Sequence, residues 1–223
     1  MRFKFLSIAV LMLAAATGQV QAGVILSPIA ASSTLGQFNS AFPITSLIDR
    51  TGLSSTFTSG TTDFGTFMAS GATHSMFPAF GTWASTDGIR IGTMDFDLGA
   101  VYTVSQLALW DVYANRSINS FSVITSELSN FSIFSNVGSF VNHSANQATP
   151  AEVFNLVDST ARYVRLTIAS NWGSTLTQEG EIAFDVSAAS AVVPEPASLA
   201  MWGLGAVGMM FARRRHQQKK LTA

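Results

Sequence analysis

The chain has 223 residues and contains no cysteine. Its fold therefore cannot use disulfide bonds, and no metal site in it can be built on thiolates. Histidine is also scarce, because the three histidines stand far apart at positions 74, 143 and 216. The pattern G-x-S-x-G, which marks the nucleophile of many hydrolases, is missing as well. These absences remove several common kinds of catalytic and metal site.

Charged residues make up only 11% of the chain, and they are unevenly distributed. Seven of the twelve basic residues lie before residue 5 or after residue 212. Residues 23–193 keep five arginines against twelve aspartates and glutamates, which is a formal net charge of −7. An acidic surface repels phosphate backbones, so we do not expect nucleic-acid binding.

The N-terminus has the features of a secretory signal peptide. Arg2 and Lys4 precede an apolar run over residues 5–16, and Val20 and Ala22 place small residues at the −3 and −1 positions. We therefore expect export and cleavage after Ala22, which removes residues 1–22. The alternative is an uncleaved anchor, for which the apolar run is short.

A second apolar run, residues 197–212, carries no charge and is followed by a basic tail over residues 213–220. As a helix its sixteen residues would reach about 24 Å, against ~30 Å for the hydrocarbon core of a bilayer. The basic tail would stay in the cytoplasm by the positive-inside rule. The run also contains G-x-G-x-x-G at 203–208. No strand precedes this pattern, so we interpret its glycines as contact positions of a membrane helix rather than a dinucleotide site.

Residues 192–220 resemble the PEP-CTERM sorting signal, because a Pro-Glu-Pro motif, a short apolar helix and an arginine cluster follow one another. The resemblance implies recognition by exosortase, a membrane enzyme of Gram-negative bacteria. Exosortase would remove the tail after a transient hold in the inner membrane and release the protein toward the cell surface. The residues that carry the motif are Pro194, Glu195, Pro196, Arg213, Arg214 and Arg215. A permanent single-pass anchor is the alternative.

Between the two ends, apolar and polar residues alternate with a period of two in segments 94–99, 104–113, 120–126, 162–170 and 181–186. In the clearest segment, we expect residues 164, 166 and 168 to point inward and residues 163, 165 and 167 to point outward. Such segments, separated by Gly, Asn and Ser turns, predict an all-β antiparallel sandwich. We find no amphipathic helix of useful length and no internal repeat.

Five pieces of this central region carry a second resemblance. They are SLIDRTGLSSTFTSG (46–60), WAS (83–85), MDFDLGAVYTVSQLALWDVY (94–113), INSFSVITS (118–126) and ARYVRLTIASNWGSTLTQEGEIAFDV (161–186). In this order they resemble the discoidin, or coagulation factor 5/8 type C, domain. The resemblance implies a galactose-binding-like jelly roll over residues 23–190, a fold also found among carbohydrate-binding modules. Residues 23–41 would form an edge strand leading into it.

The discoidin resemblance also implies a structural Ca²⁺ ion. Asp49 and Glu181 stand where the family has its carboxylate ligands, and loop carbonyls would complete the six to eight oxygens that Ca²⁺ takes. Arg50 departs from the family, which has glycine at this position. The alternative is that Asp49 caps a turn and Glu181 is solvated.

Ligands of discoidin-like lectins sit on loops at one end of the sandwich, where an aromatic ring stacks on a sugar. The resemblance therefore implies Trp172, Asn115 and Arg116 as candidate ligand-binding residues, since each follows a predicted strand. We expect Trp83 and Trp110 to lie in the core, because aromatic side chains bury large areas. The apolar segment 75–83 is either a lip of the binding site or a lid on the core.

No set of residues in the sequence predicts catalysis. The carboxylate pairs Asp95 with Asp97 and Glu179 with Glu181 are two apart along predicted strands, where we expect them to face water. We therefore predict a non-enzyme: an exported, exosortase-processed surface or matrix protein that binds extracellular polysaccharide, in an exopolysaccharide or biofilm. The alternatives are a structural matrix protein without a specific ligand, and a polysaccharide hydrolase.

Overall fold

The computed structural model describes residues 23–76, 81–143 and 148–189. The chain divides into two units, residues 1–189 and residues 190–223, and all described residues belong to the first unit. The predicted signal peptide, the PEP motif at 194–196, the helix at 197–212 and the basic tail at 213–220 lie outside the described residues. Within the described ranges, no helix is long and apolar enough to cross a membrane.

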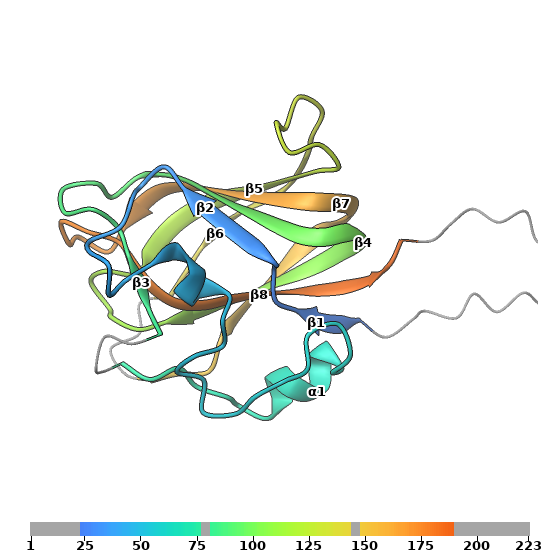
Figure 1. Ribbon diagram of the computed structural model, residues 1–223, viewed down its shortest axis with the longest axis horizontal. Coiled ribbons are helices and arrows are strands. Elements are labelled where there is room, and N and C mark those ends of the chain that lie inside the picture. Colours follow the sequence, from blue (N-terminus) through green and yellow to red (C-terminus); the bar gives the residue numbers. More distant parts are fainter. Residues whose placement is uncertain (1–22, 77–80, 144–147, 190–223) are drawn as a thin grey trace, which may run out of the picture. The chain divides into compact units, whose positions relative to one another are not determined.

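The described chain is an antiparallel β-sandwich (Figure 1), with its main core formed by buried apolar side chains. The elements are β1 (Val24–Leu26), β2 (Ala30–Ser33), the 3-10 helix η1 (Ile44–Leu47), α1 (Phe64–Ala69), β3 (Trp83–Ala84), β4 (Gly92–Asp111), β5 (Ile118–Ser126), β6 (Ser135–Val141), β7 (Glu152–Asn171) and β8 (Gln178–Ala188). The main strand order is β1-β8-β4-β7-β5-β6, while β2 pairs with β4 and β3 with β8. This arrangement confirms the predicted antiparallel jelly roll.

The two long strands β4 and β7 pass from one layer of the sandwich to the other. Residues 92–97 of β4 pair with β2 and with residues 163–168 of β7, whereas residues 102–111 of β4 pair with β8. The register shifts between Asp97 and Tyr102, where Gly99 has a φ of 87°, a backbone conformation that favours glycine. The chain thereby bends between layers without breaking the strand.

The alternation of apolar and polar residues in the sequence agrees with the burial of the side chains in the structure. Val164, Leu166 and Ile168 are buried, while Thr167 between them is exposed. The main core contains these three residues together with Trp83, Met94, Phe96, Leu98, Leu107, Leu109, Ile182, Phe184 and Val186, among others. Burial of apolar surface on this scale is the main force that stabilises such a domain.

A second apolar cluster lies on the other face of β4 and β8. Trp110 packs there with Phe57, Phe64 and Phe67, and its indole nitrogen donates a hydrogen bond of 2.9 Å to the carbonyl of Ala72. α1 has only six residues, and its first turn is capped by Asp63, whose Oδ1 accepts from the amide of Thr66. Segment 53–74 therefore covers a sheet face that a simple sandwich would expose to water.

Asp95 and Asp97 lie on the outward face of β4, as expected, but their side chains are only 30% and 21% exposed because each is paired with an arginine. Each aspartate forms a two-point ion pair with an arginine of the neighbouring strand β7: Asp95 with Arg165 at 2.6 and 2.7 Å, and Asp97 with Arg162 at 2.9 Å for both contacts. Asp95 is the register partner of Arg165, so strand pairing places the two charges opposite each other. The pairing holds the pKa of Asp97 below its usual value through the hydrogen bonds from Arg162.

Candidate ligand site at the loop end of the sandwich

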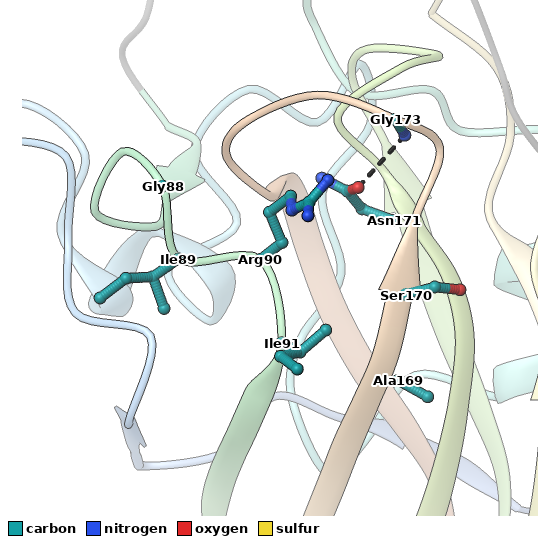
Figure 2. A pocket seen from close by; sticks show the side chains of 8 residues that line it. All are labelled: Gly88, Ile89, Arg90, Ile91, Ala169, Ser170, Asn171 and Gly173. Carbon is teal, nitrogen blue, oxygen red and sulfur yellow. Dashed lines mark hydrogen bonds between the residues drawn. The ribbon is translucent and has the colours of Figure 1, made fainter.

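An open pocket of about 530 Å³ lies where β4 begins and β7 ends. The two strands are antiparallel, and Gly92 at the start of β4 is the register partner of Ile168 near the end of β7. The loop before β4 and the loop after β7 therefore leave the sheet side by side and form the walls of the pocket (Figure 2). The lining residues are Gly88, Ile89, Arg90, Ile91, Ala169, Ser170, Asn171 and Gly173.

Hydrogen bonds join these two loops into one unit. The amide of Gly88 donates to the carbonyl of Thr175 at 2.9 Å, and the Thr175 hydroxyl donates to Asp87 Oδ1 at 2.6 Å. The Thr177 hydroxyl donates to the carbonyl of Arg90 at 3.1 Å, and Ser85 and Thr177 exchange two further bonds. The shape of the pocket is consequently determined by main-chain contacts as well as by side-chain packing.

The loop after β7 also contacts the loop between β4 and β5. The amide of Trp172 donates to the carbonyl of Ser117 at 3.2 Å, and the amide of Ser174 donates to the carbonyl of Asn115 at 2.9 Å. The amide of Gln178 donates to the carbonyl of Arg116 at 3.0 Å. Residues 115, 116 and 172, which sequence analysis selected, therefore lie on adjoining loops at one end of the sandwich.

These three side chains play different parts at that end. The guanidinium of Arg116 donates to Gln178 Oε1 at 2.9 Å and lies over the ring of Tyr113, so it supports the loop. Asn115 is exposed, and Trp172 is 41% exposed. Trp172 does not line the pocket itself, although Asn171 and Gly173 on either side of it do. Its ring is an accessible apolar surface next to the pocket.

Inside the pocket, most polar side chains already have partners in the protein. The Asn171 amide nitrogen donates to the carbonyls of Ser174 and Leu176, and its oxygen accepts from the amide of Gly173 (Figure 2). The Ser170 hydroxyl is 2.6 Å from the hydroxyl of Ser120. Arg90 extends from its loop toward the end of β7, and its guanidinium has no hydrogen-bond or ion-pair partner among the described residues.

Arg90 was not among the site residues predicted from the sequence. The signal available was the short sequence Gly88-Ile89-Arg90-Ile91-Gly92, in which an arginine stands between two glycines just before a predicted strand. The adjacent loop, residues 172–177, is more than eighty positions away in the sequence, so only the strand pairing brings the two together.

Directly below the loop end, a pair of carboxyl groups is buried, which corrects the prediction that Glu179 faces water. Glu179 Oε1 accepts from the amide of Ile118 at 2.6 Å, and the amide nitrogen of Asn142 donates to Asp111 Oδ1 at 2.8 Å and to the Ile118 carbonyl at 3.1 Å. Burial raises the pKa of Asp111 to about 6 and that of Glu179 well above its usual value. The carboxyl pair and Asn142 attach the start of β5 to β8.

Glu181 is also buried rather than solvated, because β8 lies between β4 and β1 and both of its faces are covered. Its Oε2 accepts from the amide of Arg50 at 2.8 Å, while its Oε1 is buried without a donor. Burial raises the pKa of Glu181 to about 9. The structure thus brings Glu181 against the loop that carries Asp49, as the resemblance implied.

The loop that carries Asp49 contains a turn that the Asp49 side chain stabilises. Asp49 is exposed, and its Oδ1 accepts from the amide of Thr51 at 2.7 Å, which is a turn-capping contact. Arg50 has a φ of 64°, the left-handed conformation for which glycine is the usual residue. The departure from glycine therefore introduces backbone strain at this position while leaving the turn in place.

His74 is buried beside this turn. Its Nε2 is 2.9 Å from the carbonyl of Thr51, and its Nδ1 is 2.9 Å from the carbonyl of Ser75. The ring packs against Gly52 and Gly180, where a Cβ atom would come within 2.6 and 2.7 Å of it. Burial lowers the pKa of His74. Within the described ranges, no three His, Cys, Asp or Glu side chains gather as a metal site.

Comparison with known proteins gives one match to a family and several to solved structures. The PEP-CTERM protein-sorting motif matches residues 192–215. No curated protein sequence matches the chain. A family 89 glycoside hydrolase from Clostridium perfringens, in complex with 2-acetamido-1,2-dideoxynojirmycin, aligns with a TM-score of 0.51 and 16% identity, over 78% of this chain and 16% of that one.

Two carbohydrate-binding modules align over most of their own length. The family 32 module from Clostridium perfringens NanJ, in complex with galactose, has a TM-score of 0.49 and 14% identity, over 73% of this chain and 98% of that one. The CBM32 of AlyQ, in complex with 4,5-unsaturated mannuronic acid, has a TM-score of 0.45 and 22% identity, over 72% and 96%. The chain thus carries a PEP-CTERM protein-sorting motif at residues 192–215, preceded by an antiparallel jelly-roll β-sandwich.

Proposed function

We propose that the loop end of the sandwich binds carbohydrate and that the protein acts by binding rather than by catalysis. The observation that carries this proposal is a pocket lined by two hydrogen-bonded segments, residues 88–91 and 169–173, which holds an arginine without a protein partner and has an exposed tryptophan beside it. Sugar sites combine an apolar surface for the C–H face of the ring with a few fixed polar groups for its hydroxyls. Trp172, Ile91 and Arg90 supply both kinds of group at this end.

Replacement of Trp172 by alanine is expected to reduce retention of the protein in polysaccharide-containing native gels by about five- to thirtyfold, because loss of stacking on one sugar ring removes ~1–2 kcal/mol. Phe134→Ala is the matched control. Phe134 is 58% exposed and follows the far end of β5, so its loss should leave retention unchanged. If every polysaccharide that retards the wild type retards Trp172→Ala equally, Trp172 is not part of the binding site.

A structural matrix protein without a specific ligand is the alternative. It requires that no polysaccharide, including the host's own, retards the full chain in these gels, and that the protein self-associates instead. Release of reducing sugar by the protein would favour a hydrolase and would contradict the proposed binding role.

We also propose that exosortase of a Gram-negative host removes the tail, and that the sandwich is released to the surface or into an exopolysaccharide matrix. Support comes from the sorting motif at residues 192–215 and from the basic residues that follow its apolar run. Mass spectrometry of the protein from the host medium should find a chain that begins at Gly23 and ends near Pro194, without Arg213–Arg215. The intact chain in the cytosol would contradict this route.

We further propose that a structural Ca²⁺ ion can bind beside the Asp49 turn. The buried Glu181 Oε1, which lacks a donor, supports this proposal, because a buried carboxylate oxygen needs either a proton or a cation. Glu181, Asp49 and main-chain carbonyls of the turn would hold the ion, and oxygen ligands of this kind suit Ca²⁺. The ion would join the turn to β8 and stabilise the domain.

A further inference from the structure

We propose that the pocket between residues 88–91 and 169–173 selects sugars that carry a carboxylate, such as uronic acids, and that Arg90 is the residue that recognises the carboxylate. This inference rests on the proposed carbohydrate-binding function and names the class of sugar. It follows from the hydrogen-bonding state of the arginines, from the neutral lining of the pocket and from the position of Arg90.

The arginines in the described ranges differ in whether their guanidinium groups have partners in the protein. Arg162 and Arg165 form two-point ion pairs with aspartates, and Arg116 donates to Gln178. Arg50 donates to the carbonyl of Phe57 and lies over its ring. Of the five arginines in the described ranges, Arg90 is the one whose guanidinium lacks such a partner. A guanidinium has five donors in a planar fork that matches the two oxygens of a carboxylate.

The lining of the pocket has no charged side chain apart from Arg90. No carboxylate is among the lining residues, and the nearby Asp87 is engaged by the Thr175 hydroxyl at 2.6 Å. The side-chain amide nitrogen of Asn171 donates to two carbonyls of its own loop, and the oxygen accepts from Gly173. Arg90 therefore supplies the pocket with a positive charge that no lining side chain neutralises, in a domain whose formal net charge is −7.

The side chain of Arg90 is placed where a bound sugar could reach it. Figure 2 shows the Arg90 side chain reaching from the 88–91 loop toward Asn171, across the opening between the two walls. Ile91, which is 61% exposed, and Ala169 add apolar surface to the same pocket. A sugar ring can rest on this surface while its carboxylate meets the guanidinium. The hydrogen bond from Thr177 to the Arg90 carbonyl holds the backbone of Arg90 in place.

The net negative charge of the domain repels acidic polymers at long range, whereas a contact with Arg90 acts at short range. The Debye length is about 8 Å at 0.15 M salt, so the general repulsion is largely screened under physiological conditions. Binding of an acidic polysaccharide should therefore persist, or strengthen, between 0.02 and ~0.15 M salt. A purely electrostatic attraction would show the opposite dependence.

The test compares polygalacturonate with the same polymer after methyl esterification, which removes the charge and keeps the sugar backbone. The full chain in mild detergent, with EGTA present to exclude calcium bridging, is run in native gels that contain either polymer. We expect retention by polygalacturonate to be at least about tenfold stronger, the equivalent of ~1.4 kcal/mol. Arg90→Gln should abolish this preference, and Arg90→Lys should restore only part of it, because lysine keeps the charge without the fork.

Leu128→Glu is the control for net charge. Leu128 lies just beyond the far end of β5 and is exposed, so this substitution makes the domain more negative by one charge, as Arg90→Gln does, but away from the pocket. Wild-type retention by Leu128→Glu, with loss in Arg90→Gln and equal melting temperatures for both, supports the proposal. Equal losses in the two variants would overturn it.

The outcomes separate this inference from the proposed function. If the protein binds both polymers equally and Arg90→Gln has no effect, selection of carboxylates by Arg90 is wrong while carbohydrate binding stands. If the wild type binds neither these polymers nor any neutral polysaccharide, the proposed function itself is wrong.

Discussion

Between pH 7 and pH 9, in the presence of EGTA, the free energy of unfolding of the domain is expected to fall by about 2 kcal/mol on account of Glu181 alone. Burial raises the pKa of Glu181 to about 9 in the folded protein, while in the unfolded chain it returns to its ordinary value near 4.5. Over this range the folded state retains a proton that the unfolded state has lost. The unfolded state is therefore favoured as the pH rises. The stabilisation that protonated Glu181 gives at acidic pH is lost as the pH rises through the pKa that Glu181 has in the folded protein.

Several other groups contribute to this pH dependence. Glu179 acts in the same direction as Glu181, since burial also raises its pKa, and Asp111, with a pKa of about 6, acts mainly below pH 7. His74 opposes them below its ordinary pKa of 6.5, because burial lowers its folded pKa and the unfolded state takes up the proton first. The range from pH 7 to 9 avoids this opposition.

Urea unfolding followed by circular dichroism at several pH values measures the effect, with Glu181→Gln as the matched variant. Glutamine keeps an acceptor for the Arg50 amide but cannot ionise, so the variant should lose the Glu181 part of the decline. Millimolar Ca²⁺ should reduce the decline in the wild type only, because a cation can replace the proton. If the free energy of unfolding depends on pH in the same way in Ca²⁺ and in EGTA, the proposed Ca²⁺ ion is wrong. If the free energy of unfolding of the wild type does not change with pH, Glu181 is not held protonated.

Trp110→Ala is expected to destabilise the domain by about 3–5 kcal/mol, the range for loss of a large buried aromatic side chain. Trp110 is 1% exposed and joins β4 to the segment that contains α1. The substitution removes its packing against Phe67, and it leaves the carbonyl of Ala72 buried without its donor. The free energy of unfolding in urea, measured by circular dichroism, gives the size of the effect.

Two further variants show where this stability comes from. Trp172→Ala removes the same side chain from an exposed position, so its effect on stability should stay within about 1 kcal/mol. Trp110→Phe keeps much of the ring volume but loses the bond to Ala72, and it should fall between the two. The Trp110 variants should also make the segment 53–74 more sensitive to proteolysis. An effect of Trp110→Ala as small as that of Trp172→Ala would contradict the role of the second cluster.

Much of the fold could be predicted because the relevant signal is local. The alternation at residues 163–168 and at Phe96 and Leu98 reports which side chains face the core, since successive residues of a strand point to opposite faces. Trp83 and Trp110 were expected in the core and are buried there. The sorting signal is likewise a short contiguous pattern, and the match to residues 192–215 confirms it.

The residues of the candidate site could not be predicted in this way, because their neighbours in the structure are distant in the sequence. Arg90 is one exposed arginine in a short loop, and nothing in the neighbouring sequence separates it from Arg162 or Arg165, which are paired. Strand pairing supplies aspartate partners to those two and places Arg90 beside the end of β7. Likewise, the carboxyl groups of Glu179 and Glu181 follow an alternation that usually indicates an exposed face, but segments distant in sequence cover both faces of β8.

The amino-acid pattern was thus enough to predict most of β4, β5 and β8, the second half of β7, the buried tryptophans and the sorting signal, but not β6 or the two short strands β1 and β2. Which carboxylates are buried, which arginines are paired and which loops form a pocket could be seen only in the folded chain. The physical reason is that strand periodicity and sorting motifs depend on neighbouring residues, whereas burial and charge pairing depend on groups that the chain brings together from positions dozens of residues apart.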